Sequence, residues 1–103
     1  MIIVINNNGG GIFESLPIAG KAKRFKEYFI TPHNLELAAI VKSFGINHQL
    51  ITNRSQLQSH LIKSLNKNSP SVLEIQTNAA RSAELRNKYY NEVKNKLNEE
   101  FKI

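Results

Sequence analysis

The chain has 103 residues, of which 41% are hydrophobic and 21% are charged, and it contains no cysteine. This length fits one domain or part of one, and the composition is that of a soluble globular protein. Disulfide frameworks and thiolate metal sites are therefore excluded. The apolar run at the start is too short for a signal peptide or a membrane span, so we expect a cytoplasmic protein.

The net charge of +6 comes from 14 basic residues against eight acidic ones, and all eight acids are glutamates. The basic residues are dispersed, apart from a cluster between Lys21 and Lys26. No binding motif accompanies this charge, so it does not indicate a nucleic-acid partner. The cluster is interpreted either as a solvated loop or as a surface that favours anionic substrates.

Ile2 to Ile5 form a continuous apolar run that ends in asparagine and glycine, which is typical of a strand buried on both faces of a parallel sheet. We expect this segment to be a central strand. Residues 12–30 contain a proline and a glycine and lack helical periodicity, which predicts a loop with short helical turns. Thr31 followed by Pro32 predicts the N-cap and first turn of a helix that ends at Gly45.

A second strand is predicted over residues 46–51, followed by a helix that Thr52 or Asn53 caps and in which leucines recur every four residues. Residues 71–77 predict a third strand, and a long amphipathic helix follows it almost to the C-terminus. This alternation predicts an α/β fold, a three-layer α/β/α arrangement around a parallel sheet. Three strands make a thin sheet, so we expect an uncovered edge and self-association.

The segment from Asn6 to Gly11 lies at the predicted carboxyl end of the first strand, where open parallel sheets bind their ligands. Glycines there either let backbone N–H groups approach phosphate oxygens or form a tight turn that needs positive φ. The spacing fits neither a P-loop nor a dinucleotide fingerprint. The three asparagines favour a hard cation such as Mg²⁺, which accepts neutral oxygen ligands when a bound diphosphate supplies negative charge.

These residues resemble the second half of the thiamine-diphosphate-binding motif, in which Asn-Asn ends a buried strand downstream of Gly-Asp-Gly. The whole chain is similar to the MenD family, the thiamine-diphosphate-dependent synthases of menaquinone biosynthesis. The similarity is carried by Asn6-Asn7-Asn8-Gly9-Gly10-Gly11-Ile12-Phe13, Leu16-Pro17-Ile18, Phe25, Phe29, Thr31-Pro32-His33, Val72-Leu73-Glu74-Ile75, Thr77-Asn78 and the final helix.

The resemblance implies that residues 1–103 are the C-terminal part of a thiamine-diphosphate-binding (PP) domain, without its upstream half and without the N-terminal domains. It implies a transferase that decarboxylates 2-oxoglutarate and adds the succinyl unit to isochorismate. The implied cofactors are thiamine diphosphate and Mg²⁺, with Mn²⁺ as a substitute. The implied assembly is a homo-oligomer, with neither a nucleic-acid nor a membrane partner.

The resemblance also implies a role for individual residues. The metal ligands would be the side-chain oxygen of Asn7 and the carbonyl of Gly9. The cofactor-binding residues would be Asn6, Asn7, Asn8, Gly9, Gly10, Ile12 and Phe13. Phe13 and Leu16 would lie on the substrate side. The simpler alternatives are a plain turn for Asn7 and Gly9, and ordinary core packing for the three apolar residues.

The aspartate of the family's Gly-Asp-Gly is a charged Mg²⁺ ligand, and this chain contains no aspartate. We therefore expect the chain alone to be inactive and to bind the cofactor weakly. Two other hypotheses remain open: a piece of another thiamine-diphosphate enzyme, of the acetolactate synthase or 2-oxo acid decarboxylase type, or a non-catalytic α/β binding module. His33, His48 and His60 lack the spacing of a metal site, and no catalytic residue is assigned.

Overall fold

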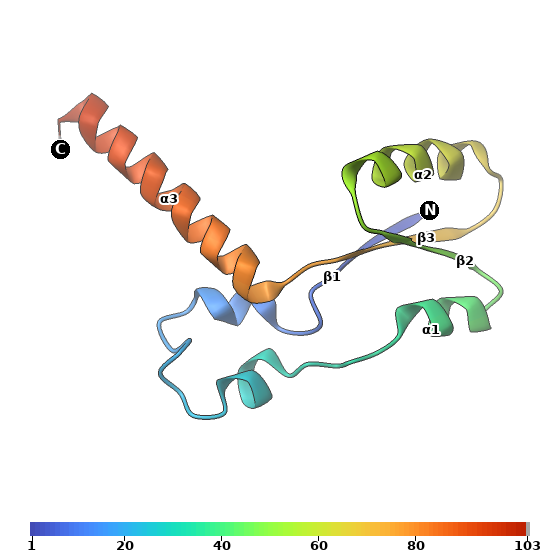
Figure 1. Ribbon diagram of the computed structural model, residues 1–103, viewed down its shortest axis with the longest axis horizontal. Helices are drawn as coiled ribbons and strands as arrows, with labels where there is room; N and C mark the ends of the chain where they lie inside the picture. Colours follow the sequence, from blue (N-terminus) through green and yellow to red (C-terminus); the bar gives the residue numbers. More distant parts are fainter. Residues whose placement is uncertain (103) are drawn as a thin grey trace. The chain divides into compact units, whose positions relative to one another are not determined.

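The computed structural model describes residues 1–102 and has the predicted alternation of strands and helices (Figure 1). In chain order the elements are β1 (Ile2–Asn6), η1 (Gly11–Ser15), η2 (Lys26–Ile30), α1 (Leu37–Ser43), β2 (Asn47–Ile51), α2 (Arg54–Asn66), β3 (Ser71–Gln76) and α3 (Ala79–Phe101). The chain divides into two compact units. The first comprises residues 1–8 and 33–77, and the second comprises residues 9–32 and the chain from residue 78 onward.

The first unit contains a parallel sheet in the order β1, β3, β2. β3 is the central strand, and its Leu73 is only 1% exposed. The prediction that residues 2–5 form a central strand is wrong, because β1 is an edge strand of this chain and its Ile2 and Ile5 are 61% and 68% exposed. An apolar run shows that a strand tolerates burial on both faces, whereas its place in the sheet depends on which partner strands are present.

α1 and α2 lie on opposite faces of this sheet, so the first unit has the predicted α/β/α layers (Figure 1). α2 begins as expected, because the Oδ1 of Asn53 accepts a hydrogen bond from the backbone N–H of Gln56 at 2.9 Å. The predicted start of the preceding helix at Thr31 is wrong, because α1 begins only at Leu37. Gly45 follows the last turn of α1, as predicted.

Thr31 belongs to the second unit, where it ends η2. Its backbone is left-handed, with φ 43°, and its N–H donates to the carbonyl of Lys26 at 2.9 Å. A threonine that closes one helical turn in this conformation is not available as the extended N-cap of the next helix. Thr31 therefore marks the end of η2 and not the start of α1.

The second unit consists of the loop with the helical turns η1 and η2, and of α3. Phe29 makes an edge contact with Phe13, with centroids 5.9 Å apart, and stacks on Phe25 at 5.4 Å. The side chain of Arg86 on α3 donates to the hydroxyl of Ser15 in η1 at 2.9 Å. The predicted loop with short helical turns and the predicted long final helix are both confirmed.

Candidate functional site

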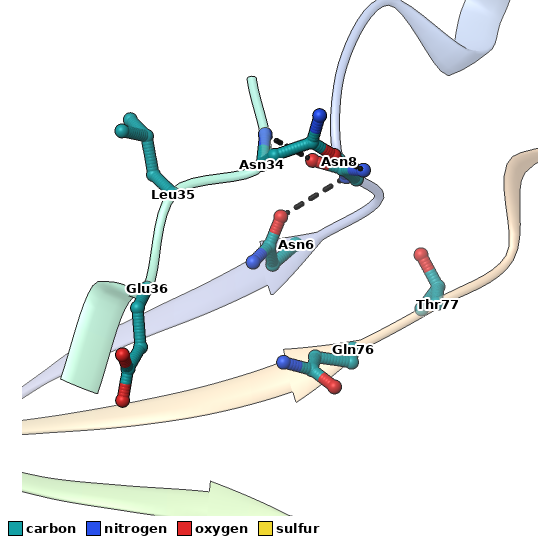
Figure 2. Close-up of a pocket in the computed structure, with 7 residues that line it drawn as sticks. All are labelled: Asn6, Asn8, Asn34, Leu35, Glu36, Gln76 and Thr77. Atoms are coloured by element: carbon teal, nitrogen blue, oxygen red, sulfur yellow. Dashed lines mark hydrogen bonds between the residues drawn. The ribbon is translucent and has the colours of Figure 1, made fainter. Parts of the chain in front are cut away.

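A pocket of about 470 Å³ opens at the carboxyl ends of β1 and β3 in the first unit (Figure 2). Its lining is Asn6, Asn8, Asn34, Leu35, Glu36, Gln76 and Thr77. The parallel register pairs Asn6 with Gln76, and the N–H of Thr77 donates to the Asn6 carbonyl at 2.9 Å, so the two strand ends lie at one edge. Most of the lining side chains carry amide, carboxylate or hydroxyl groups, which suits a polar ligand.

The loop that leaves β1 is held by a reciprocal pair of asparagines, Asn8 and Asn34. The Nδ2 of Asn8 donates to the Oδ1 of Asn34 at 2.9 Å, and the backbone N–H of Asn34 donates to the Oδ1 of Asn8 at 2.8 Å. Both residues are left-handed, with φ 60° and 51°, a conformation that asparagine tolerates better than most residues. Figure 2 shows the two side chains against one another beside Asn6.

Below this loop, the side chain of Asn6 joins a buried polar network on the sheet. Its Nδ2 donates to the Oε1 of Glu74 at 2.8 Å, while its Oδ1 accepts from the backbone N–H of Asn8 at 3.0 Å. The other oxygen of Glu74 lies 2.7 Å from the Nε2 of His48, and these two side chains are only 3% and 5% exposed. Gln76 adds a longer bond to Glu74 Oε1, at 3.3 Å.

Burial of Glu74 favours its neutral form and by itself raises its pKa. Hydrogen bonds from Asn6, His48 and Gln76, with the electrostatic attraction of His48, outweigh burial, so the pKa of Glu74 lies below its ordinary value. Glu74 is therefore ionised at neutral pH, and both of its oxygens can only accept hydrogen bonds. It follows that Asn6 must present its NH₂ group, and His48 an N–H, towards Glu74.

In the second unit, two glycines bring the loop backbone against η2. Gly9 has φ 144°, and a Cβ at this position would overlap the carbonyl oxygen of Ile30. A Cβ at Gly10 would lie 2.8 Å from the carbonyl oxygen of Phe29, and the N–H of Gly10 donates to Ile30 at 2.7 Å. Close packing against η2 thus requires a residue without a side chain at both positions.

The three apolar residues predicted beside the cofactor differ in their burial. Ile12 is 67% exposed, Leu16 is 44% exposed, and Phe13 is 36% exposed while it contacts Phe29. Core packing within this chain therefore covers more than half of the surface of Phe13 and Leu16, and only about a third of Ile12. In the second unit they offer apolar surface on and next to η1.

Sequence reasoning found the asparagine run but missed the side chains that hold it, Asn34, Glu74 and His48. An acid inside the apolar strand Val72 to Ile75 was the one local signal for this network.

His33 makes a local turn, because its Nδ1 accepts from the N–H of Leu35 at 2.9 Å. Within residues 1–102 there is no group of three or more His, Asp or Glu side chains that could hold a metal by themselves. No helix in that range is both long and apolar enough to span a membrane.

Comparisons with known proteins find several synthases of one name that are similar to this chain. The 2-succinyl-5-enolpyruvyl-6-hydroxy-3-cyclohexene-1-carboxylate synthase of Crocosphaera subtropica is 44% identical over 82 residues, which are 80% of this chain and 14% of that protein. The synthase of the same name from Trichodesmium erythraeum is 44% identical over 85 residues, 82% of this chain and 14% of that protein. The one from Roseiflexus castenholzii is 34% identical over 86 residues, 84% of this chain and 15% of that protein.

These synthases form the MenD group to which the sequence was found similar, and the chain spans only about 14% of the length of the first two. A family described as the thiamine pyrophosphate enzyme, C-terminal TPP binding domain, matches residues 1–75, more than half of the chain. Thiamine pyrophosphate is the same compound as thiamine diphosphate. The chain therefore belongs to the family of C-terminal thiamine-pyrophosphate-binding domains of thiamine pyrophosphate enzymes.

Proposed function

We propose that this chain supplies one half of the cofactor site of a thiamine-diphosphate- and Mg²⁺-dependent synthase, a transferase that decarboxylates 2-oxoglutarate and adds the succinyl unit to isochorismate. The observation that carries the proposal is the hydrogen-bonded asparagine loop at the carboxyl end of β1. The names of the similar proteins support this reaction. The protein is expected to act in the cytoplasm.

The residues fit a diphosphate-bound cation by their donor chemistry. Asn6 and Asn8 use their side chains to hold the loop, so they give it its shape. Asn7 and Gly9 then supply the ligands, an amide oxygen and a backbone carbonyl. The Gly9 carbonyl accepts from the N–H of Gly11 at 2.9 Å, which fixes its direction within the loop. Neutral oxygens suit Mg²⁺ or Mn²⁺ when phosphates balance the charge.

Apolar residues after the loop complete this half of the site. Ile12 and Phe13 would border the cofactor, and Phe13 and Leu16 the substrates. Their exposed surface supports this assignment, because a ligand that covers it would remove apolar area from water. When bound, thiamine diphosphate supplies the electron sink needed for loss of carbon dioxide from a 2-oxo acid.

The other half of the site must come from elsewhere. This chain contains no aspartate, and Mg²⁺ usually keeps at least one carboxylate ligand beside the phosphates. We therefore propose that the charged ligand lies on an upstream part of the same domain, and that an N-terminal domain of a second subunit covers the cofactor in a homo-oligomer. The chain alone is expected to be inactive and to bind the cofactor weakly.

A chimera tests the function directly. In the Crocosphaera subtropica synthase, this chain replaces the matched 82-residue segment. We expect the chimera to consume isochorismate only with 2-oxoglutarate, thiamine diphosphate and Mg²⁺. Asn7→Ala should lower this activity by at least about 100-fold, because loss of a residue that merely orients a metal ligand already costs about 10- to 100-fold, whereas the exposed Asn68→Ala should leave it unchanged.

The other hypotheses predict different results in the same assay. Turnover with pyruvate in place of 2-oxoglutarate would indicate another thiamine-diphosphate enzyme. A folded chimera that does not bind thiamine diphosphate would indicate a non-catalytic module and contradict the proposal. Titration calorimetry of the isolated chain gives a further check, because micromolar binding that Asn7→Ala abolishes would show that the missing half is not needed.

A further inference from the structure

A continuous chain of hydrogen bonds links strand β2 to the asparagine loop. It runs from His48 through Glu74 to Asn6, then to the backbone of Asn8, and ends at Asn34. All five residues belong to the first unit. The loop is thus connected to a buried carboxylate on the central strand, although Glu74 does not line the pocket itself.

We propose that Glu74 is a positioning residue for the cofactor loop, which fixes the side-chain amide of Asn6 in the one orientation that accepts the N–H of Asn8. The functional part of this inference rests on the proposed cofactor site. The sequence similarity had singled out the strand that contains Glu74, but it gave the side chain no role.

The argument begins with the two ends of the Asn6 amide. A carboxylate without a proton only accepts hydrogen bonds, so the NH₂ group of Asn6 is the end that faces Glu74 at 2.8 Å. The oxygen is thereby directed to the N–H of Asn8 at 3.0 Å. If the amide were reversed, its oxygen would meet the carboxylate and the Asn8 N–H would face an NH₂ group. Glu74 therefore excludes the reversed amide.

Burial gives a second line of argument. Glu74 is 2% exposed at the middle of the central strand, where its pairing partners are Val4 and Leu50. Moving a carboxylate out of water is costly, so a buried one contributes little to stability compared with a well-packed apolar residue of similar size. Stability alone thus does not account for a carboxylate here, whereas orientation of Asn6 does. His48 completes the arrangement, because its Nε2 lies 2.7 Å from the second oxygen and so helps to hold the carboxylate in place.

The first experiment measures the loop in the chain itself. Amide hydrogen exchange of Asn8, followed by NMR, reports whether its N–H keeps the Asn6 acceptor. Glu74→Leu should raise this exchange rate at least about 10-fold, because Asn6 can then rotate. Glu74→Gln can still present an oxygen to Asn6 and should stay within about 3-fold of the wild type. Gln49→Leu, a matched change on β2 away from the loop, should have no effect.

The second experiment measures thiamine diphosphate affinity in the chimera. Glu74→Leu should raise the Kd by about 10- to 100-fold, the usual effect of losing a residue that orients a ligand, and Glu74→Gln should restore most of the affinity. In an Asn6→Ala background, Glu74→Leu should add nothing further, because Glu74 acts through Asn6. An independent structural effect would instead add to the loss.

The two experiments distinguish a failure of the positioning role of Glu74 from a failure of the proposed cofactor site. Unchanged Asn8 exchange in Glu74→Leu would overturn the positioning role, whatever the cofactor does. A wild-type chimera that does not bind thiamine diphosphate would contradict the proposed function, while the exchange measurement would still decide the role of Glu74. Glu74→Thr is measured in parallel, because a strand-forming residue too short to reach Asn6 gives the same test if Glu74→Leu does not fold.

Discussion

Replacement of Asn34 separates the effect of its side-chain hydrogen bond to Asn8 from the effect of its left-handed backbone. Asn34→Gly removes the acceptor of the 2.9 Å bond from Asn8 but keeps the backbone N–H and tolerates φ 51°. Because this pair is exposed, we expect a loss near the low end of the usual 0.5–1.5 kcal/mol, about 0.5 kcal/mol. Asn34→Ala removes the same bond and keeps a Cβ in the left-handed region without the side-chain amide that lets asparagine tolerate it, so it should be about 1 kcal/mol less stable than Asn34→Gly.

The ordering of these variants in urea unfolding is the test. We expect Asn34→Asp to match the wild type most closely, since it keeps both the acceptor and the tolerance of positive φ. Asn34→Gly should follow, and Asn34→Ala should be the least stable, by about 1.5 kcal/mol in total. Asn68→Ala, at an exposed position without positive φ, serves as the control. If Asn34→Ala were as stable as Asn34→Gly, the left-handed backbone assigned to this position would be refuted.

Three further predictions concern acid stability, the glycines and the edge strand. The pKa of Glu74 is lower in the folded chain than its ordinary 4.5, so the stability that this carboxylate contributes is complete above pH 4.5 and is lost as the pH falls through the folded pKa. Urea unfolding between pH 6 and pH 3 should show this loss of stability. The variant Glu74→Gln should not show it. In the same assay, Gly9→Ala should lower the free energy of unfolding by more than about 2 kcal/mol, whereas Gly45→Ala, with φ 69° and open space around its Cα, should lower it by only about 1 kcal/mol. Equal losses would show that the contact of Gly9 with η2 is unimportant for stability. The exposed Ile3 and Ile5 of β1 should promote self-association, so light scattering should find larger species in the wild type than in Ile3→Lys, and a monomeric wild type at high concentration would contradict this.

The order of the strands and helices could be predicted because helix caps and apolar runs are local sequence patterns. Asn53 occurs three residues before the N–H that it caps, and the short apolar stretches of β1 and β3 distinguish strands from the helices between them. The position of β1 at an edge could not be predicted in this way, because sheet order is set by pairing between distant segments. The start of α1 was missed because Thr31 fits two local structures, the N-cap of a following helix and the left-handed residue that closes η2, and the chain adopts the second.

In the candidate site, too, the local motif could be predicted from the sequence, whereas the contacts between distant residues could not. Asn6 to Asn8 and the following glycines were found because the motif is contiguous. Asn34 lies 26 residues from Asn8 along the chain, and Glu74 lies 68 residues from Asn6, so neither contact leaves a sequence pattern. In the sequence, His48 lacks the spacing of a metal ligand, and its role as a donor to Glu74 appears only when β2 and β3 are paired.

The position of Glu74 also bears on why the loop itself carries no acid. A carboxylate among residues 6–9 would repel a bound diphosphate, whereas neutral amides can both shape the loop and ligate a cation whose charge the phosphates balance. In this chain the carboxylate is instead set back on the central strand, with His48 against one oxygen and two amides against the other. We infer that its oxygen serves to orient Asn6 rather than to bind a metal. Glu74→Asp tests this distinction, because the shorter side chain keeps the charge but withdraws it from Asn6, so the Asn8 N–H should exchange faster although the carboxylate remains.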